Sequence, residues 1–249
     1  MTLFAALRAA VAPQRLPATI IVGGREVPLV VERRATARGV RLRADAVQGV
    51  IRLSLPVRGG TTEAARLLGN HGDWLARQVA RWPQPQPFAP GAAIPFDGGT
   101  LVIDWSPGHP RTPQQKGNRL MIGGPPDLTA ARTRRWLQAA ALADLVPATH
   151  IIAGRVARPV SQIRVGDPRG RWGSCTSSQS RIAYSWRLIL APPEALRFVV
   201  AHEVAHRLHM DHSAAFKAAE ARLFGGPTAA ARGVLRAAGP GLRGVGRSL

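Results

Sequence analysis

The sequence predicts an α+β protein in which an N-terminal part rich in antiparallel strands precedes a part with a short sheet and long helices. Runs of alternating apolar and polar residues fill much of the first half of the chain. Apolar residues at helical spacing dominate the second half. The chain has 249 residues, of which 45% are hydrophobic, and this is enough to bury a sizeable core.

The first part is predicted to begin with a β-hairpin. Residues 19–22 and 27–32 flank Gly23-Gly24, a pair typical of two-residue hairpin turns. Residues 39–43 and 49–55 alternate apolar residues with arginine, so one sheet face should be buried and the other positively charged. The arginines assigned to that solvated face are Arg33, Arg34, Arg38, Arg41, Arg43 and Arg52.

One helix is predicted to follow the strands, from Thr61 to Trp82, because apolar residues recur there at helical spacing. The proline-rich run 83–90 is then expected to be a stiff connector. Further short strands are predicted at 93–96, 100–104 and 119–122, with a polar loop over 107–117. The β-rich part is thus expected to extend from residue 19 to residue 125.

The second part is predicted to open with a helix from Asp127 to about Val156, which Pro147 should kink or divide. Strands are expected at 162–165 and 181–186, separated by a turn over 166–175. Pro192-Pro193 marks the start of the next helix, and a last helix is expected over 213–223. The Gly, Ala and Arg composition of residues 225–249 predicts a mobile basic tail.

The N-terminal residues 1–18 are treated as a separate extension. The apolar stretch 1–12 resembles a signal peptide only weakly, because Arg8 interrupts it and no basic residue precedes it; a short helix or frayed end is expected. The single cysteine, Cys175, excludes an internal disulfide and a zinc site made of several thiolates. This composition suits the reducing cytoplasm. No contact with a membrane is expected, since no apolar run approaches the roughly 20 residues needed to span a bilayer.

The charge of the chain is strongly basic, with a formal net charge of +20. Only Lys116 and Lys217 are lysines, and the remaining basic residues are arginines. An arginine-, alanine- and glycine-rich composition is typical of GC-rich genomes, so the charge is weak evidence for a nucleic-acid partner. It is compatible with weak, salt-sensitive contact to polyanions. A nucleic-acid-associated basic protein with an auxiliary zinc site, or a DNA-linked protease, is therefore kept as the alternative function.

The pattern H-E-x-x-H occurs at His202, Glu203 and His206. Two histidines four positions apart lie on the same face of a helix and can bind one metal ion, and the glutamate between them can take a proton from metal-bound water. A zinc hydrolase site needs a third protein ligand, for which His209 and His212 are candidates. His209 is disfavoured, because about 10 Å of axial rise separates it from His202 on one rigid helix. His212 is preferred, because a helix that ends near residue 210 would let the chain fold back towards the metal.

Other residues near the motif have less specific interpretations. Tyr184 is the only tyrosine and could donate a hydrogen bond to a developing oxyanion, although core packing is the preferred interpretation. Asp211 is expected to cap a turn. The strand at 181–186 could lie at the edge of the site and pair with an extended peptide.

Several sequence blocks occur together in a familiar order. They are Arg171-Trp-Gly-Ser-Cys175, Ser185-Trp-Arg-Leu-Ile189, Ala191-Pro-Pro193, Val199-Val-Ala-His-Glu-Val-Ala-His206 and Asp211-His-Ser213 with Phe216. This arrangement resembles the YgjP-like metallopeptidase family of bacteria, zincins distantly related to SprT-type proteases. The resemblance covers about residues 20–225 and departs from the usual family pattern at Asp211 and Lys217, neither of which is a ligand position.

The resemblance implies a zincin-like domain over residues 126–224 with a short sheet and an active-site helix. It further implies one zinc ion per chain, held by His202, His206 and His212, with Glu203 as the catalytic base. The substrate would be a peptide or protein.

Overall fold

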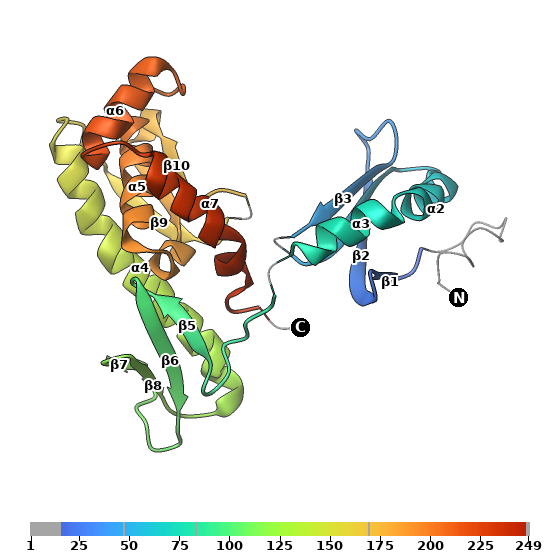
Figure 1. Ribbon diagram of the computed structural model, residues 1–249, viewed down its shortest axis with the longest axis horizontal. Helices are drawn as coiled ribbons and strands as arrows, with labels where there is room; N and C mark the ends of the chain where they lie inside the picture. Colours follow the sequence, from blue (N-terminus) through green and yellow to red (C-terminus); the bar gives the residue numbers. More distant parts are fainter. Residues whose placement is uncertain (1–15, 47, 83, 169, 248–249) are drawn as a thin grey trace. The chain divides into compact units, whose positions relative to one another are not determined.

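The computed structural model describes residues 16–46, 48–82, 84–168 and 170–247 (Figure 1). Its mixed sheets and helices confirm the predicted α+β class. The chain divides into two compact units, Met1–Pro83 and Gln84–Leu249. The helix or frayed end predicted for residues 1–12 lies outside the described residues.

The first unit contains a four-stranded sheet in the order β1 (Thr19–Val22), β2 (Arg25–Arg34), β4 (Val50–Pro56) and β3 (Arg41–Asp45). The predicted hairpin is confirmed: Val22 pairs with Arg25, and Gly23 and Gly24 have φ angles of 57° and 78° that the tight turn requires. The pairs β1–β2 and β3–β4 are antiparallel as predicted, but β2 and β4 run parallel, so the sheet is mixed. The chain crosses from β2 to the far edge, forms β3, and returns as β4 antiparallel to β3.

Two helices, α2 (Thr61–Asn70) and α3 (Gly72–Ala80), replace the single helix predicted here. The break falls at His71, whose φ of −111° and ψ of 19° lie outside the helical region. Gly69 and Gly72 flank it, and glycine is a poor helix former, so the helix is easily interrupted at this point. Apolar residues of both helices still complete one core with the sheet.

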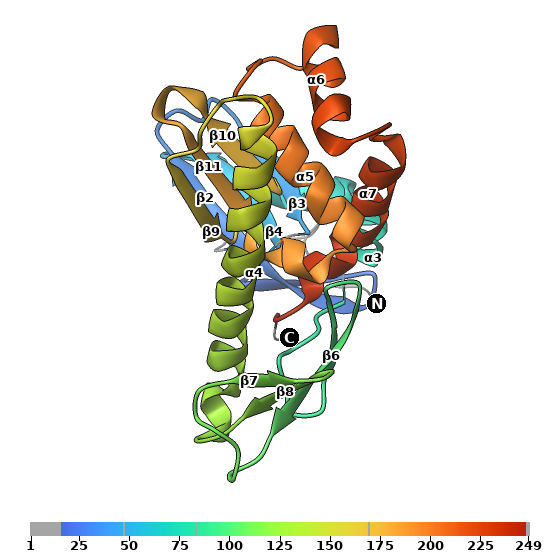
Figure 2. The ribbon, with the colours of Figure 1, turned by 90° about the vertical axis from the view of Figure 1, so that its left-hand side faces the viewer.

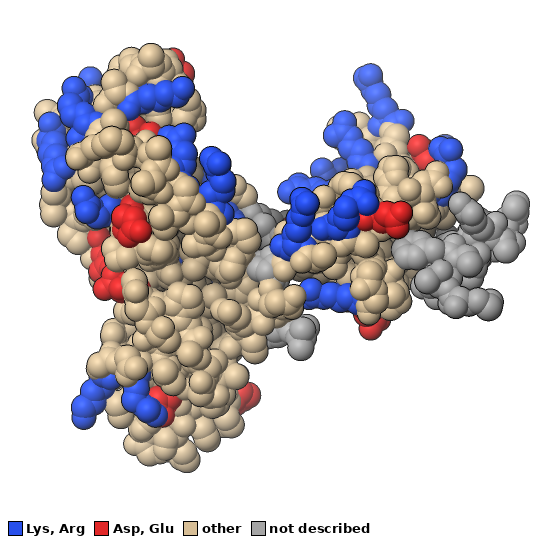
Figure 3. Space-filling view, viewed as in Figure 1, with Lys and Arg blue, Asp and Glu red and all other residues tan. Residues whose placement is uncertain are grey.

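The arginine-rich face of this sheet is partly neutralised by acidic neighbours. Arg52 pairs with both Glu32 and Asp45, and Arg34 pairs with Glu32. Arg41 and Arg43 are exposed, and basic side chains stand out on the visible face of this unit (Figure 3). Some of the positive charge is therefore used within the sheet, and contact with nucleic acid through this face stays a prediction.

The second unit begins with a sheet in the order β5 (Ala93–Phe96), β6 (Gly99–Trp105), β8 (Arg119–Ile122) and β7 (Gln114–Lys116). Three of these strands match the prediction, whereas β7 lies in the segment expected to be a loop. A 3-10 turn, η1 (Pro126–Leu128), leads into the long helix α4 (Thr129–Gly154).

Helix α4 packs on β8 near one end and on β9 and α5 further along, so it spans the second unit (Figure 2). The boundary predicted at residue 125 therefore differs from the structure, in which Leu120, Ile122 and Leu137 belong to one core. Pro147 does not divide α4. Both Pro147 and Ala143 are exposed, so water can hydrate the carbonyl that lacks its helical partner.

Residues 126–154 are long and apolar enough, by length and hydropathy alone, to cross a membrane, although no such segment was expected from the sequence. One stripe of the helix is buried in the protein at a spacing of four residues. It consists of Thr129, Thr133, Leu137, Ala141, Leu145 and Thr149. This periodic burial is typical of a core helix in a globular domain.

A second, three-stranded sheet has the order β10 (Gly173–Thr176), β11 (Arg181–Ser185) and β9 (Gln162–Gly166). Strand β10 lies in the segment predicted as a turn, and it forms one edge of this sheet. The turn η2 (Ser177–Gln179) joins β10 to β11, and η3 (Trp186–Leu190) leads to α5 (Pro193–Ala205). The predicted helix start at Pro192-Pro193 is confirmed.

The chain ends in two helices, α6 (Ala214–Phe224) and α7 (Ala229–Gly244). The mobile tail predicted from composition is instead largely helical. Ala231, Leu235 and Leu242 of α7 are buried in the core that includes α5, since few but well-spaced apolar residues suffice to dock a helix.

Arg187 of η3 holds the C-terminal end of α7. Its Nη1 donates to the carbonyls of Leu242 at 2.8 Å and Val245 at 2.6 Å. Its Nε and Nη2 donate to the two carboxylate oxygens of Asp167 at 2.9 and 3.1 Å. The guanidinium thus satisfies carbonyls at the helix end that have no helical partner.

Candidate metal centre

Helix α5 positions the first part of the motif. Val200 and Val204 are fully buried on the side of the helix that faces the core. His202 and Glu203 lie on a different side of the same helix. The helix ends at Ala205, five residues before the predicted end, and the amides of Leu208 and His209 both bond the carbonyl of Ala205. This tight turn reverses the chain immediately after His206.

The reversed chain brings His212 back to α5. Asp211 stabilises the turn as predicted, because its Oδ1 accepts hydrogen bonds from the amide and the hydroxyl of Ser213. The Ser213 hydroxyl in turn accepts from the amide of Phe216 and caps α6.

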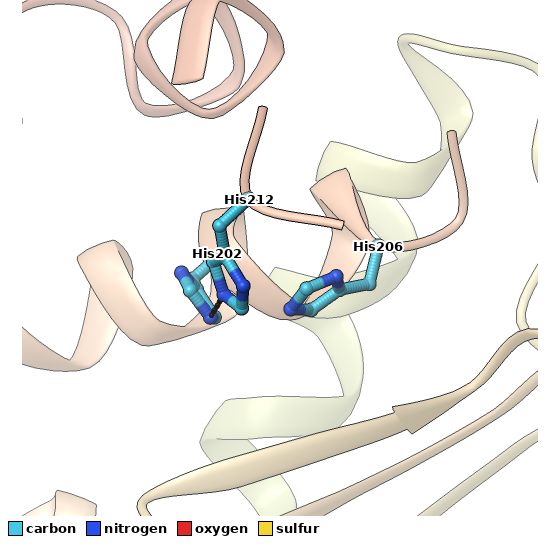
Figure 4. Close-up of side chains that lie close together, drawn as sticks. All are labelled: His202, His206 and His212. Carbon is cyan, nitrogen blue, oxygen red and sulfur yellow. Dashed lines mark hydrogen bonds between the residues drawn. The ribbon is translucent and has the colours of Figure 1, made fainter. Parts of the chain in front are cut away.

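The structure brings the side chains of His202, His206 and His212 together, and their rings converge in Figure 4. The potential ligand atoms all lie within 4.8 Å of one another. The Nε2 atoms of His202 and His212 are 3.4 Å apart. Two nitrogens bound tetrahedrally to zinc at about 2.0–2.1 Å would be separated by about 3.4 Å, so this pair already has the spacing that the ion requires.

Hydrogen bonds at the other ring nitrogens support the same interpretation. Nδ1 of His202 lies 2.7 Å from Glu220 Oε1, and Nδ1 of His206 lies 3.1 Å from the carbonyl oxygen of His209. Both partners are acceptors, so each Nδ1 carries the proton and each Nε2 keeps its lone pair for a metal. Burial also lowers the pKa of both histidines, although Glu220 acts to raise the pKa of His202. The lower pKa favours the neutral imidazole, which is the form that binds metals. The donor set therefore fits zinc, which prefers nitrogen and sulfur ligands in a tetrahedral arrangement.

His209, the other candidate ligand, is not part of this group. Its backbone carbonyl orients His206, but its ring is not among the converging side chains. The early end of α5 explains the difference, because His209 no longer continues the face that carries His202.

Glu203 is 4% exposed and lies directly against strand β10. A Cβ atom at Gly173 would come within 2.5 Å of Glu203 Oε1, so this carboxylate fits only because residue 173 has no side chain. Burial raises the pKa of Glu203 to about 8, with Arg171 opposing the shift. A carboxyl group with a raised pKa is a better acceptor for a proton from water.

We expect the substitution Gly173→Ala to reduce catalysis without removing the metal. The three atoms nearest to the added methyl group would all belong to Glu203, which is not one of the three converging histidines. A misplacement of about 1 Å can cost roughly a hundredfold in rate, so a tenfold to hundredfold fall in kcat is expected. Gly170→Ala is the matched control, since a Cβ there meets nothing within 4 Å. Equal kcat values for both variants would contradict this role of Gly173.

Tyr184 of β11 pairs with Gly173 of β10 next to Glu203, but its side chain is buried. Tyr184 is 1% exposed, and its hydroxyl is 3.0 Å from the Thr149 hydroxyl, so it is a core residue as the preferred interpretation had it. Strand β11 is the central strand of its sheet, so β10 offers the edge at the site instead. Burial raises the pKa of Cys175 to about 11, which keeps its thiol neutral.

Two residues that contact the histidines were not assigned a site role from sequence. Phe216 is buried against all three imidazoles, with ring centroids 4.6–5.1 Å away. Glu220 binds His202 and lies one helical turn after Phe216 on the same face of α6. That i, i+4 spacing is the sequence signal that could have revealed Glu220.

Comparison with protein families gives a match over residues 38–236, to the family described as YgjP-like, metallopeptidase domain. The chain belongs to the YgjP-like metallopeptidase family. The resemblance seen in the sequence is thereby confirmed, and family membership indicates a metal-dependent peptidase. The matched range includes α5, α6 and the first half of α7, and so Glu203, Phe216 and Glu220 as well as the three histidines. Searches of curated proteins and of solved structures find no significant match.

Proposed function

We propose that this YgjP-like protein is a zinc metallopeptidase that hydrolyses peptide bonds with Glu203 as general base. The observation that supports the proposal most is the convergence of three imidazoles beside a buried carboxylate that is not one of the ligands. His202, His206 and His212 would hold the ion and leave a fourth position for water. Bound zinc supplies Lewis acidity, which lowers the pKa of water and polarises a carbonyl.

The protein's own residues would then perform the proton transfers and hold the substrate. The Glu203 carboxylate accepts a proton from the attacking water and delivers it to the leaving amine nitrogen. Strand β10 has one edge that pairs with no other described strand, and its backbone N–H and C=O groups can bind an extended peptide. Because Gly173 on this strand touches Glu203, a peptide held there would lie next to the base.

The test combines metal analysis with a peptide-library assay. We expect the purified full chain to contain about one zinc ion per chain, as a single tetrahedral site predicts. We expect His202→Ala to lose both the zinc and the cleavage activity. Elemental analysis measures the metal, and mass spectrometry of the library measures cleavage. A protein that purified without metal, and whose stability and activity did not respond to added zinc, would refute the proposal.

A further inference from the structure

A buried carboxylate lies behind the metal centre. Glu220 of α6 is 1% exposed and uses both of its oxygens. Oε1 accepts from His202 Nδ1 at 2.7 Å. Oε2 accepts from the Thr228 hydroxyl at 3.1 Å and from Arg232 Nη2 at 2.8 Å. One side of the carboxylate therefore contacts a candidate ligand, and the other contacts the start of α7.

An ionised carboxylate removed from water needs hydrogen bonds and a counter-charge to remain in place. Arg232 supplies the counter-charge, and its guanidinium lies 5.4 Å from the centre of the Phe198 ring, which restricts its position. Thr228 supplies a neutral donor at the N-terminal cap position of α7. Helix α7 thus provides both groups that compensate Glu220.

We propose that Glu220 is a positioning residue for His202. Arg232 forms no hydrogen bond with the three converging histidines, and it acts on the metal centre through Glu220. This inference rests on the proposed zinc site and extends it to α7, the segment whose composition suggested a mobile tail. The acceptor at Nδ1 fixes the ring orientation of His202 and directs its Nε2 lone pair towards His206 and His212. Loss of such an outer acceptor typically costs about 10–100-fold in metal affinity or activity.

The zinc dissociation constant of the full chain, measured by competition with a chromophoric chelator, tests this chain of contacts. We expect Glu220→Ala to weaken zinc binding about 10–100-fold, as loss of the outer acceptor predicts. We expect Arg232→Gln to weaken it as well, by a smaller factor, and Arg232→Lys to restore part of the affinity. Arg236→Gln is the matched control, because Arg236 is exposed one turn further along α7.

The double variant separates positioning from a general loss of stability. If Arg232 acts through Glu220, Arg232→Gln should have little further effect on zinc affinity once Glu220 is alanine, whereas independent effects would add. If Glu220→Ala does not fold, Glu220→Gln can replace it in the same comparison of single and double variants with Arg232→Gln, because it changes the side-chain volume less. In the zinc-loaded wild type, the Nδ1 proton of His202 should also give an imidazole NMR signal that shifts in Arg232→Gln.

The possible outcomes distinguish this inference from the function on which it rests. Wild-type zinc affinity in both the Glu220 and the Arg232 variants would overturn the inference and leave the zinc site standing. Additive effects of the two substitutions would overturn the indirect role of Arg232. A wild-type protein that binds no zinc would overturn both the inference and the proposed function.

Discussion

Glu203→Gln is expected to abolish most peptide cleavage while leaving the zinc in place. Glutamine has nearly the shape of glutamate, so it fits against Gly173, but its amide cannot accept the proton of the attacking water. General-base catalysis contributes about 10²–10⁴-fold to rate, and kcat should fall by that factor. Zinc content should stay at the wild-type level, because Glu203 is not among the three converging side chains.

The measurement compares kcat and zinc stoichiometry in the same preparations. Glu194→Gln is the control, since Glu194 lies on the same helix but is exposed in its first turn. Loss of zinc from Glu203→Gln would make Glu203 a ligand, and full activity would remove it from the mechanism.

Arg187→Met is expected to have the largest effect on stability. The substitution keeps an apolar stem in the core but leaves the carbonyls of Leu242 and Val245 without their donor. Each buried group left unpaired costs about 1–3 kcal/mol, so the loss of both bonds should lower the free energy of unfolding by roughly 2–6 kcal/mol. Denaturant titration measures the change, and Arg236→Met on the exposed side of α7 should stay within about 0.5 kcal/mol of wild type. Equal stability of the two variants would show that Arg187 does not hold α7.

The ion pair between Arg187 and Asp167 predicts how the stability of the protein depends on pH. Burial acts to raise the pKa of Asp167, but its hydrogen bonds and charge interaction with Arg187 hold it below the ordinary value of 3.8. The contribution of a carboxylate with a lowered pKa is complete above its unfolded-state pKa and is lost as the pH falls through the lowered value. Arg187→Met should therefore reduce the loss of stability on acidification below about pH 4.

The approach of His202, His206 and His212 was predictable from sequence because these residues are close along the chain. The spacing of His202 and His206 places both on one side of a helix. The turn-forming residues Asp211 and Ser213 indicate where the chain can fold back and bring His212 towards that helix. The hairpin at Gly23-Gly24 was predictable for the same reason. In each case the residues that decide the structure lie within a few positions of one another.

Features that depend on distant partners were not predictable in this way. Nothing in the sequence of 173–176 shows that this short segment pairs with β11 and receives Glu203. The Gly- and Ala-rich end looked mobile because its few apolar residues gain their stability only from the core they meet. Pro147 was expected to interrupt α4, but the cost of a missing hydrogen bond is small where the freed carbonyl faces water.

The closeness of the three histidines along the chain has a consequence for the order of events during folding. His202 and His212 are only ten positions apart, so closing this loop costs little entropy. Gly173 lies 203 − 173 = 30 positions from Glu203, and contacts between more distant segments form more slowly. Metal capture is therefore expected to precede the appearance of activity during refolding.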